Sequence, residues 1–418
     1  MTRILHRQIH TDMPVAAGGE GVYLIDTDGK RYLDASGGAA VSCLGHGDKD
    51  VIEAIKAQLD TMAFAHTGFF TSEPSETLAD LLIEAAPDGI GAVYFVSGGS
   101  EAIEAALKMA RQYFVEIGEL KRSKFIARHQ SYHGNTLGAL SVGGNVARRE
   151  PFKELLMDVA HIAPCYPYRD RRDDESEEEY GLRVANELET EIQRLGAENV
   201  CAFVAETVGG ATAGVLPPVT GYLKRIRDIC NAHGILLILD EVMCGMGRTG
   251  HTFACAEDRV VPDLIAVAKG LGAGYQPIGA TLVHERIFNA FKDGSGFFQH
   301  GHTYMGHPAA CAGALAVQTK IKENGLLSQV RERGEQLVEK LHERFGNHPH
   351  IGDIRGRGLF RAIEIVADRT TKEPFDPGLK IFAKIKANAM KEGLVCYPGG
   401  GTADGARGDH VLLAPPFI

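Results

Sequence analysis

The chain has 418 residues, of which 44% are hydrophobic and 23% are charged, as in ordinary globular proteins. This length predicts a large α/β domain with a smaller companion. The net charge of -10, with no basic block to offset it, argues against nucleic acid as a main partner. No apolar run approaches membrane-spanning length, and the start, "MTRILHRQIHTD", lacks the apolar core of a secretory signal.

The chain contains eight cysteines, and none of them forms a CxxC pair. Scattered cysteines fit a reducing compartment and indicate neither a disulfide framework nor a zinc site. We therefore expect a cytoplasmic protein without a metal centre. The only low-complexity stretch is the charge run "RDRRDDESEEE" at 169–179, in which Ser176 and Glu179 fit a helix capping box.

In chain order, the first predicted element is a β-hairpin. The stretch "VYLIDTDGKRYLDASGG" begins at Val22 and turns around Asp28 and Gly29. The middle of the chain then alternates short apolar runs with segments of helical period, a pattern typical of βαβ units and a mostly parallel sheet. The five apolar runs lie at 92–96, 124–127, 201–205, 235–239 and 264–268.

Apolar residues at helical spacing predict helices between these strands. One stripe follows Ser100, another covers 184–195, and a third covers 223–230, with Gly234 at the expected C-terminal cap. Near the C-terminus, "GLFRAIEIV" and "LVCYPG" each predict a strand. A helix with one apolar face is expected between them, over 381–390.

Polar or glycine-rich residues follow every one of the five apolar runs. They are "SGGSEA", "RHQSYHG", Glu206, "DEV" and Lys269, in chain order. In an open parallel sheet, ligands bind beyond the carboxyl ends of the strands. We therefore expect a glycine turn, an aromatic–histidine pair, two carboxylates and a lysine to meet in one crevice.

The "SGGSEA" segment places Gly98, Gly99 and Ser100 at a strand-to-helix turn. Glycines let backbone N–H groups approach an anion, and a helix N-terminus favours negative charge, so the turn predicts a site for one phosphate. A plain turn with Ser100 as the N-cap is an equally good interpretation of this segment alone. The segment is neither GxGxxG nor a P-loop, which disfavours a dinucleotide.

Asp240 and Lys269 each follow an apolar run, so both are expected to be largely buried. A buried carboxylate needs a cationic or hydrogen-bonding partner, and the two side chains could pair with each other. Alternatively, Asp240 faces a cationic ring nitrogen and Lys269 carries an aldehyde as a Schiff base. A phosphate turn, a stacking aromatic, an aspartate for a ring nitrogen and a lysine for an aldehyde together describe pyridoxal 5'-phosphate.

The sequence resembles the class III aminotransferases, in the subgroup of ω-amino acid and amine transaminases. The stretches that carry the resemblance, in the family's order, are "FVSGGSEAIEAALKMAR", "SYHGNTLGALS", "LLILDEVMCGMGRTG", "VAKGLGAGYQPIGA" and "QHGHTYMGHPAACAGALA". The step of 29 residues from Asp240 to Lys269 also matches. The resemblance covers nearly the whole chain.

The resemblance implies fold type I, with a large pyridoxal-phosphate-binding domain and a smaller α+β domain built from both chain ends. The expected large domain covers 51–308, and the small domain combines 1–50 with 309–418. The family also implies a homodimer with shared active sites. Relatives usually continue into another helix beyond "LLAPPFI", so a truncated end at Ile418 is compatible with the resemblance.

The resemblance also implies a role for individual residues. Lys269 corresponds to the Schiff-base lysine and Asp240 to the partner of the pyridine nitrogen. Tyr132 corresponds to the aromatic that stacks on the ring, and Thr303 to a phosphate ligand donated by the second subunit. The further cofactor contacts would be Gly98, Gly99, Ser100, His133, Glu206 and Val242, where Glu206 lies near the substrate and His133 is equally well explained as a structural residue.

Candidate substrate residues follow from departures from the family pattern. Ala40 stands about where amine transaminases often have a bulky aromatic, and the chain has no tryptophan. Phe70, beside Phe69, could supply an aromatic wall, or it could belong to the core. Arg407, in the glycine-rich "GGTADGARGDH", is the candidate cation for the acceptor carboxylate, with a solvated loop arginine as the alternative.

These features predict a ping-pong transamination from an ω-amino acid or amine to pyruvate or 2-oxoglutarate. Lys269, Asp240 and Glu206 are the expected catalytic residues. An aminomutase, racemase or decarboxylating transaminase on the same fold, and a non-catalytic phosphate- or nucleotide-binding α/β protein, are the alternatives. The sequence leaves the donor, the acceptor, the stereospecificity and any higher oligomer open.

Overall fold

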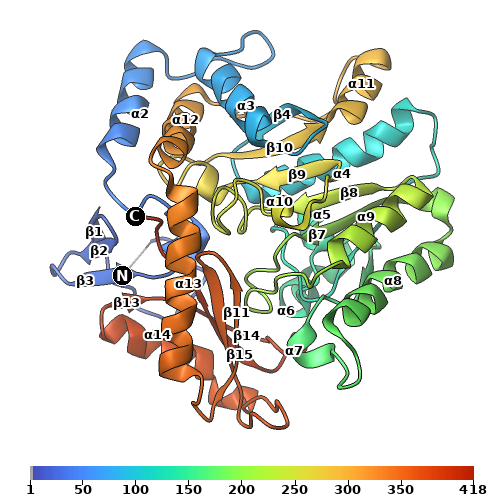
Figure 1. The fold of residues 1–418 in the computed structure, drawn as a ribbon. Coiled ribbons are helices and arrows are strands. Elements are labelled where there is room, and N and C mark those ends of the chain that lie inside the picture. The colour runs from blue at the N-terminus through green and yellow to red at the C-terminus, as the bar shows by residue number, and fades with distance from the viewer. Residues whose placement is uncertain (1–2) are drawn as a thin grey trace.

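A seven-stranded sheet forms the centre of the computed structural model, which describes residues 3–418 (Figure 1). Its strand order is β4-β10-β9-β8-β7-β5-β6, and only β10 runs antiparallel to its neighbours. The strands are β4 (Ile90–Val96), β5 (Lys124–Arg128), β6 (Ala160–Ile162), β7 (Val200–Glu206), β8 (Leu236–Asp240), β9 (Leu264–Val267) and β10 (Gly279–His284). The predicted α/β class with a mostly parallel sheet is therefore confirmed, and all five apolar runs are strands of this sheet.

Helices cover both faces of this sheet. One apolar core lies between the sheet and α3, α8, α9 and α12, and a second lies between the opposite face and α4, α5 and α11. In β8, Leu237 and Leu239 belong to the first core, whereas Leu236 and Ile238 belong to the second. Burial on both faces explains why this strand is apolar throughout. The helices are α3 (Glu73–Ala85), α4 (Gly99–Glu116), α5 (Leu137–Val142), α8 (Glu177–Leu195), α9 (Tyr222–His233), α11 (Glu285–Asp293) and α12 (Pro308–Glu323).

The helix ends match the sequence signals, with one exception. Glu179 Oε2 accepts a hydrogen bond of 2.8 Å from the backbone N–H of Ser176, so the predicted capping box begins α8. α9 ends at Gly234, whose φ of 63° is left-handed. α4 begins two residues earlier than a Ser100 cap requires, because Gly98 is its N-cap. Ser100 therefore lies in the first turn of the helix, and its description as an N-cap is wrong.

Two four-stranded sheets lie beside the central sheet, and the first combines strands from the N-terminal and C-terminal parts of the chain (Figure 1). It joins β1 (Ala16–Glu20), β2 (Tyr23–Asp26) and β3 (Arg31–Asp34) to β13 (Leu394–Val395). The second sheet has the order β11-β12-β15-β14, from β11 (Ile351–Arg357), β12 (Phe360–Ile365), β15 (Asp409–Leu413) and β14 (Tyr397–Gly400). The predicted hairpin around Gly29 is the β2–β3 pair.

The segment "LVCYPG" contains two strands, and its prediction as one strand is wrong. β13 pairs in parallel with β3, whereas β14 pairs antiparallel with β15 in the other sheet. Cys396 is the residue at which the chain passes from one sheet to the other. Sharing of one sheet by both chain ends agrees with a small domain of mixed origin, while the boundaries at residues 50 and 308 stay a prediction.

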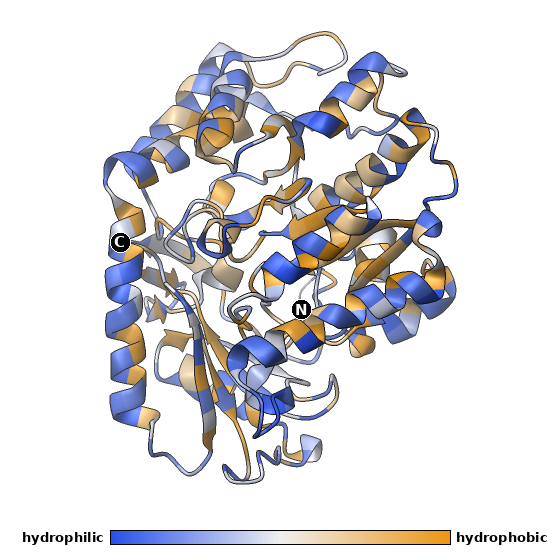
Figure 2. Ribbon diagram, turned by 45° about the vertical axis from the view of Figure 1, so that its right-hand side comes forward, coloured by the Kyte–Doolittle hydropathy of each residue, from blue (hydrophilic) through white to orange (hydrophobic). Residues whose placement is uncertain are grey.

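The remaining helices connect these layers. They are α1 (Gly37–Ala40), α2 (Lys49–Thr61), α6 (Val146–Arg149), α7 (Pro167–Asp170), α10 (Cys255–Asp258), α13 (Leu326–Phe345) and α14 (Ile381–Lys391), with 3-10 turns η1 (Glu150–Leu155), η2 (Ala197–Asn199), η3 (Lys269–Leu271) and η4 (Pro377–Leu379). Most helices carry hydrophobic residues toward the interior and hydrophilic ones outward (Figure 2). Within residues 3–418, no helix combines the length and apolarity needed to cross a bilayer.

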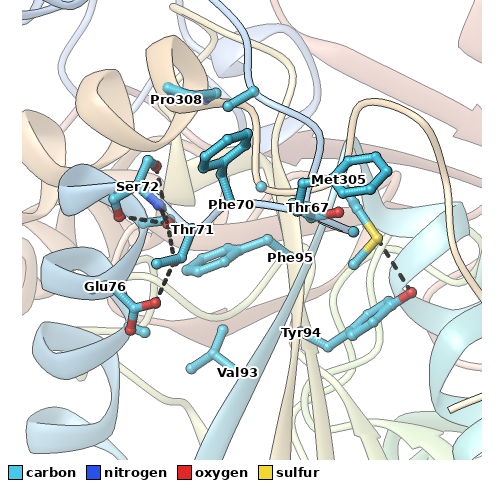
Figure 3. Close-up of a pocket in the computed structure, with 16 residues that line it drawn as sticks. Thr67, Phe70, Thr71, Ser72, Glu76, Val93, Tyr94, Phe95, Met305 and Pro308 are labelled. Atoms are coloured by element: carbon cyan, nitrogen blue, oxygen red, sulfur yellow. Dashed lines mark hydrogen bonds between the residues drawn. The ribbon is translucent and has the colours of Figure 1, made fainter. Parts of the chain in front are cut away.

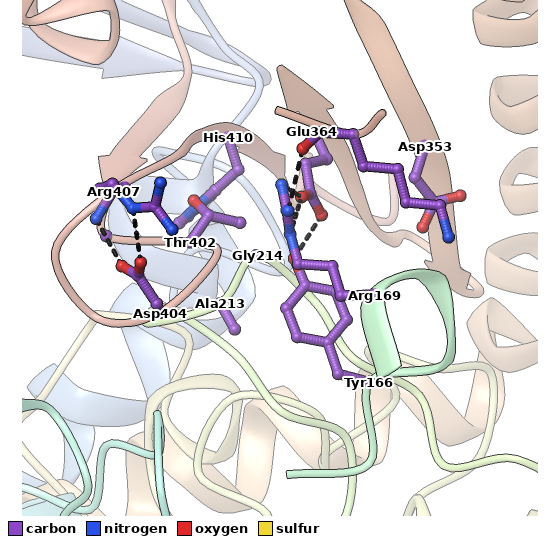
Figure 4. A network of polar contacts seen from close by, with 12 residues as sticks. Tyr166, Arg169, Ala213, Gly214, Asp353, Glu364, Thr402, Asp404, Arg407 and His410 are labelled. Atoms are coloured by element: carbon purple, nitrogen blue, oxygen red, sulfur yellow. Dashed lines mark hydrogen bonds and ion pairs between the residues drawn. The ribbon is translucent and has the colours of Figure 1, made fainter. Parts of the chain in front are cut away.

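A buried ionic network fastens the second small sheet to the central sheet (Figure 4). Glu364 on β12 is fully buried and accepts a hydrogen bond of 2.7 Å from Arg169 Nε on α7. It also accepts from the Tyr166 hydroxyl and from Arg355 Nη1 on β11. Arg355 Nη2 in turn donates to the carbonyl oxygen of Ala213 at 2.7 Å. One carboxylate thus holds two guanidinium groups from different layers of the molecule.

Substitution Glu364→Gln should destabilise the chain, because Arg169 and Arg355 then share too little negative charge in a buried site. Removal of one partner from a buried ion pair typically costs about 3–5 kcal/mol of unfolding free energy. Urea titration should therefore show a clearly lower midpoint. The control is Glu343→Gln, since Glu343 pairs with Lys340 where both side chains are about two-thirds exposed. Equal midpoints for the two variants would contradict a clamping role for Glu364.

Candidate active site

A cavity of about 140 Å³ lies at the carboxyl ends of the central strands. Most of its lining comes from residues that directly follow strands or open a helix. The lining residues are Gly99, Ser100, Tyr132, His133, Gly134, Glu206, Val208, Asp240, Val242, Met243 and Lys269. The structure therefore brings together eight of the residues selected from the sequence, and the neighbouring Gly98 is the N-cap of α4.

Lys269 follows β9 and opens a 3-10 turn with a φ of 47°, a backbone conformation uncommon for residues with a side chain. Its Nζ makes no hydrogen bond or ion pair with the residues that the structure describes, so the direct Asp240–Lys269 ion pair is not formed. Burial lowers the pKa of Lys269 to about 8, although Asp240 and Glu206 act in the opposite direction. The neutral, nucleophilic form of the amine is therefore a minor fraction at pH 7 and about half of the population near pH 8.

Asp240 ends β8, and its two carboxylate oxygens have different partners. Oδ1 accepts a hydrogen bond of 2.9 Å from the backbone N–H of Val242, and Oδ2 lies 2.8 Å from Nδ1 of His133. The His133 side chain is fully buried, and its Nε2 has no hydrogen-bond partner among residues 3–418. Because a carboxylate only accepts hydrogen bonds, Nδ1 carries the proton in this pair. His133 thus fixes the orientation of the Asp240 carboxylate.

Glu206 ends β7 and is held by backbone donors. Its Oε1 accepts a hydrogen bond of 2.7 Å from the N–H of Tyr132, and its Oε2 accepts one from the N–H of Gly210. Burial raises the pKa of Glu206, and the nearby Asp240 adds to this effect, while His133 and the backbone N–H of Tyr132 oppose it. Glu206 is therefore a rigid carboxyl group on the cavity wall, next to the backbone of the aromatic residue.

The glycine turn forms the end of the cavity at the N-terminus of α4. A Cβ atom on Gly99 would lie 2.8 Å from Val242 Cγ1, and one on Gly134 would lie 2.6 Å from Ser100 Oγ. Both positions therefore need glycine. The first N–H groups of this helix of 18 residues have no partner within the helix, and its dipole favours an anion there. The turn can hold a phosphate group, as the sequence predicts.

Tyr132 is fixed at its hydroxyl and at its ring. Asn135 Nδ2 donates to the Tyr132 hydroxyl at 3.0 Å. The guanidinium of Arg148, on α6, lies 4.6 Å from the centre of the Tyr132 ring, within the range of a cation–π contact. An aromatic ring held in this way can stack on a flat ligand in the cavity.

Besides Gly98, four of the predicted residues do not line this cavity. Ala40 is buried in an apolar cluster with Val208 and Met243, just outside it. Phe70 is 67% exposed and lines a separate cavity of about 460 Å³ with Met305 and Pro308 (Figure 3). Thr303 is exposed on the loop before α12.

Arg407 also lies outside the cavity (Figure 4). Its side chain is 51% exposed and is paired with Asp404 at 2.8 Å and with Glu373 at 3.2 Å. Asp404 Oδ1 also accepts from the backbone N–H of Arg407 at 2.7 Å. In this conformation the side chain of Arg407 is bound to Asp404 of its own loop and to Glu373. It forms no hydrogen bond or ion pair with a residue that lines the cavity of Lys269.

The sequence analysis missed three lining residues and one neighbour. Val208 lies two residues after Glu206, Met243 lies three after Asp240, and Gly134 ends the "SYHG" stretch. Their closeness to the polar strand ends was the signal available in the sequence. No comparable signal marks Arg148, because it reaches Tyr132 from a helix 16 residues further along the chain.

The donor set fits pyridoxal 5'-phosphate. An unpaired amine of lowered pKa, an oriented carboxylate, a fixed aromatic ring and a helix N-terminus meet in one cavity. The buried Nε2 of His133, which lacks a partner in the described protein, leaves a polar atom for a ligand or water beside the carboxylate. Within residues 3–418, no cluster of three or more histidine, cysteine or acidic side chains could hold a metal ion.

Comparisons with known proteins identify the family. The model of the family "Aminotransferase class-III" matches residues 6–418. An uncharacterized aminotransferase of Schizosaccharomyces pombe is 48% identical over 406 residues, which covers 97% of this chain and 88% of the relative. A diaminobutyrate–2-oxoglutarate transaminase of Halomonas elongata is 34% identical over 416 residues, which covers 98% of this chain and 87% of the relative.

Solved structures agree with the sequence relatives. A transaminase obtained by ancestral reconstruction superposes with a TM-score of 0.94 at 32% identity, covering 100% of this chain and 92% of its own. An amine transaminase from an uncultivated Pseudomonas species was solved with pyridoxal phosphate bound. It superposes with a TM-score of 0.92 at 35% identity, covering 100% of this chain and 94% of its own. The chain therefore belongs to the class III aminotransferases, which are pyridoxal-phosphate-dependent enzymes of fold type I.

Proposed function

We propose that the chain transfers an amino group from an ω-amino acid or amine to a keto acid, pyruvate or 2-oxoglutarate, by a ping-pong mechanism. The observation that carries the proposal is the amine of Lys269, unpaired and partly neutral, in the same cavity as the oriented carboxylate of Asp240. The Halomonas relative is named for an amino donor and 2-oxoglutarate, which supports transfer between two such substrates.

Bound pyridoxal phosphate supplies an aldehyde that takes up the amino group and a ring that accepts electrons from the substrate carbon. The role of Asp240 is to keep the ring nitrogen protonated, because a carboxylate stabilises a cation beside it. His133 holds that carboxylate through Nδ1 at 2.8 Å. Gly98, Gly99 and Ser100 would bind the phosphate, and Tyr132 and Val242 would enclose the ring.

Lys269 would have two roles, first as the amine that holds the aldehyde and then as the base that moves a proton from the substrate carbon. A general base works best when its pKa lies near the working pH, and the pKa of about 8 for Lys269 meets this condition. Glu206 lies on the same wall and would position the cofactor and the substrate. The three residues would therefore form the catalytic set.

The substrate contacts belong to the same proposal. Arg407 would bind an acceptor carboxylate if its loop rearranged, and its two exposed ion pairs are of the kind that contributes little stability. Ala40 leaves space next to Val208 and Met243, so the substrate end would admit bulky groups. Phe70 would contribute only across a subunit interface, because its ring lies on a different surface of the chain.

We infer further that the enzyme is a homodimer with shared active sites. The cavity of about 140 Å³ is smaller than the roughly 300–1,000 Å³ of most small-molecule sites, so one chain encloses only part of a substrate site. The surface around Thr303 exposes large aromatic side chains, including Phe69, Phe70 and Tyr304. The eight free cysteines further support a reducing location such as the cytoplasm.

A panel of donors and acceptors tests the reaction class. Each donor should yield its carbonyl product in equal amount to the amino acid formed from a separate acceptor. An aminomutase or racemase would need no acceptor, and a decarboxylating enzyme would release carbon dioxide.

Asp240→Asn keeps the shape of the side chain but loses its charge, so kcat should fall by about a hundredfold or more. Near-normal turnover in this variant would mean that Asp240 is only structural.

The pKa of Lys269 predicts the pH dependence of cofactor attachment. Only the neutral amine reacts with the aldehyde, so the attachment rate should rise about tenfold per pH unit below pH 8 and level off above it. Asp240→Asn or Glu206→Gln removes a charge that stabilises the ammonium form, so the profile should shift to lower pH.

Borohydride reduction followed by peptide mapping should label Lys269, and Lys269→Ala is the control. A label on another lysine would refute the assignment.

Mixing two defective variants tests the shared site. If Thr303 binds the phosphate of the neighbouring subunit, Thr303→Ala should weaken cofactor affinity by roughly ten- to a hundredfold, since a hydrogen bond to a charged group is lost. A heterodimer of Lys269→Ala and Thr303→Ala chains then has one site with both defects and one with neither. Activity should reappear on mixing. No recovery in a verified heterodimer would show that each site is built from one chain.

A further inference from the structure

A second cavity, of about 550 Å³, lies on the outer side of Arg148, where the N-terminal segment meets α14 and the start of β14. Arg7, Arg148 and Lys386 line it, together with the apolar surfaces of Met13, Tyr397 and Pro398. We call this cavity the vestibule. It is separate from the inner cavity that contains Lys269.

The vestibule is positively charged in a chain whose net charge is -10. Three of its lining residues carry permanent positive charge at neutral pH, and no carboxylate lines it within the described part of the chain. None of Arg7, Arg148 and Lys386 forms an ion pair with the described residues, although 54 acidic residues are available in the sequence. Unpaired cations around one cavity favour an anionic ligand.

The vestibule adjoins the inner cavity along two of its walls. Arg148 stacks on the ring of Tyr132, which lines the inner cavity. Tyr397 packs against the apolar cluster that contains Ala40 and Val208, and Val208 also lines the inner cavity. The two cavities therefore lie next to each other, with Tyr132 on one shared side and the cluster that contains Val208 on the other.

The charge of Arg148 is available, in contrast to that of Arg407. Arg407 is neutralised by Asp404 and Glu373, whereas the guanidinium of Arg148 lies over the Tyr132 ring and forms no ion pair with the described residues. A guanidinium presents paired N–H donors that match the two oxygens of a carboxylate, and it can form those bonds in its own plane while its face rests on Tyr132. Arg148 thus combines a free donor edge with a fixed position.

We propose that the vestibule binds the carboxylate of the keto acid or amino acid substrate, with Arg148 as its main ligand and Lys386 and Arg7 as attracting charges. The proposal rests on the proposed transaminase function and narrows its substrates to those with a carboxylate distant from the reacting carbon. An uncharged amine or aldehyde gains nothing from these cations, so the vestibule discriminates by charge. Met13, Tyr397 and Pro398 provide apolar contacts for the carbon chain of such a substrate.

The first test compares acceptors that differ in charge, using the holoenzyme. In Arg148→Gln, the ratio of kcat/KM for 2-oxoglutarate to kcat/KM for butanal should fall about tenfold, because a charge-assisted hydrogen bond to the carboxylate is lost. An effect transmitted through the contact with Tyr132 would instead change both acceptors alike. Lys386→Gln should lower the ratio less. Lys384→Gln, an exposed change of the same charge on the same helix, should have no effect. Equal changes for butanal and 2-oxoglutarate, or none in Arg148→Gln, would overturn the proposal.

The second test does not depend on turnover, so it separates the vestibule from the transaminase function. Calorimetry should show that succinate, which has no keto group, binds the wild-type holoenzyme and binds Arg148→Gln about tenfold more weakly. Binding should weaken as salt increases, since salt screens the attraction between exposed charges. Loss of the succinate difference would reject the vestibule even in an active enzyme. A retained difference in a chain without transaminase activity would uphold the vestibule and reject the proposed reaction.

Discussion

The burial of one amine without a counter-ion is the constraint on which the site depends. Lys269 is placed by the end of β9, a strand buried on both faces, so its backbone is fixed at the edge of the sheet where the inner cavity lies. An ammonium group in such a place is unfavourable, and the chain reduces this cost by lowering the pKa of the amine. The same lowering of the pKa increases the fraction of neutral amine, which is the form that reacts with an aldehyde.

The carboxylates around the amine are held away from it by other partners. Asp240 is engaged by His133 and the N–H of Val242, and Glu206 is engaged by two backbone N–H groups. If either carboxylate paired directly with Lys269, the ammonium form would be stabilised and the amine would lose nucleophilicity at neutral pH. His133 and the backbone N–H groups therefore help to keep the Lys269 amine neutral, although they do not contact Lys269.

Much of this arrangement could be predicted from the sequence because parallel strands bring their carboxyl ends to one edge. The five apolar runs predict that Lys269, Asp240 and Glu206 meet at that edge, and all three line the inner cavity. The His133–Asp240 pair could not be predicted, since a histidine next to an aromatic residue has many possible partners. The cap of α4 and the split at Cys396 depend on backbone angles and on pairing with distant strands. Thr303 and Phe70 are exposed, and the roles proposed for them in a homodimer depend on contacts that a single chain does not contain.

The buried or enclosed cations of the chain differ in their partners, and three kinds of partner can be distinguished. The kind of partner indicates whether a cation is structural or available to a ligand. Arg355 and Arg169 share a buried carboxylate, which makes them structural. Arg248 is fully buried and donates to the carbonyl oxygens of Leu359 and Pro415 while resting on Phe417, so its charge is met by dipoles and a ring. Lys269 and Arg148 face cavities without an acidic partner among the described residues, and a cation left unpaired in this way is available to a ligand. The inner cavity offers an amine to an aldehyde, and the vestibule offers a guanidinium to a carboxylate.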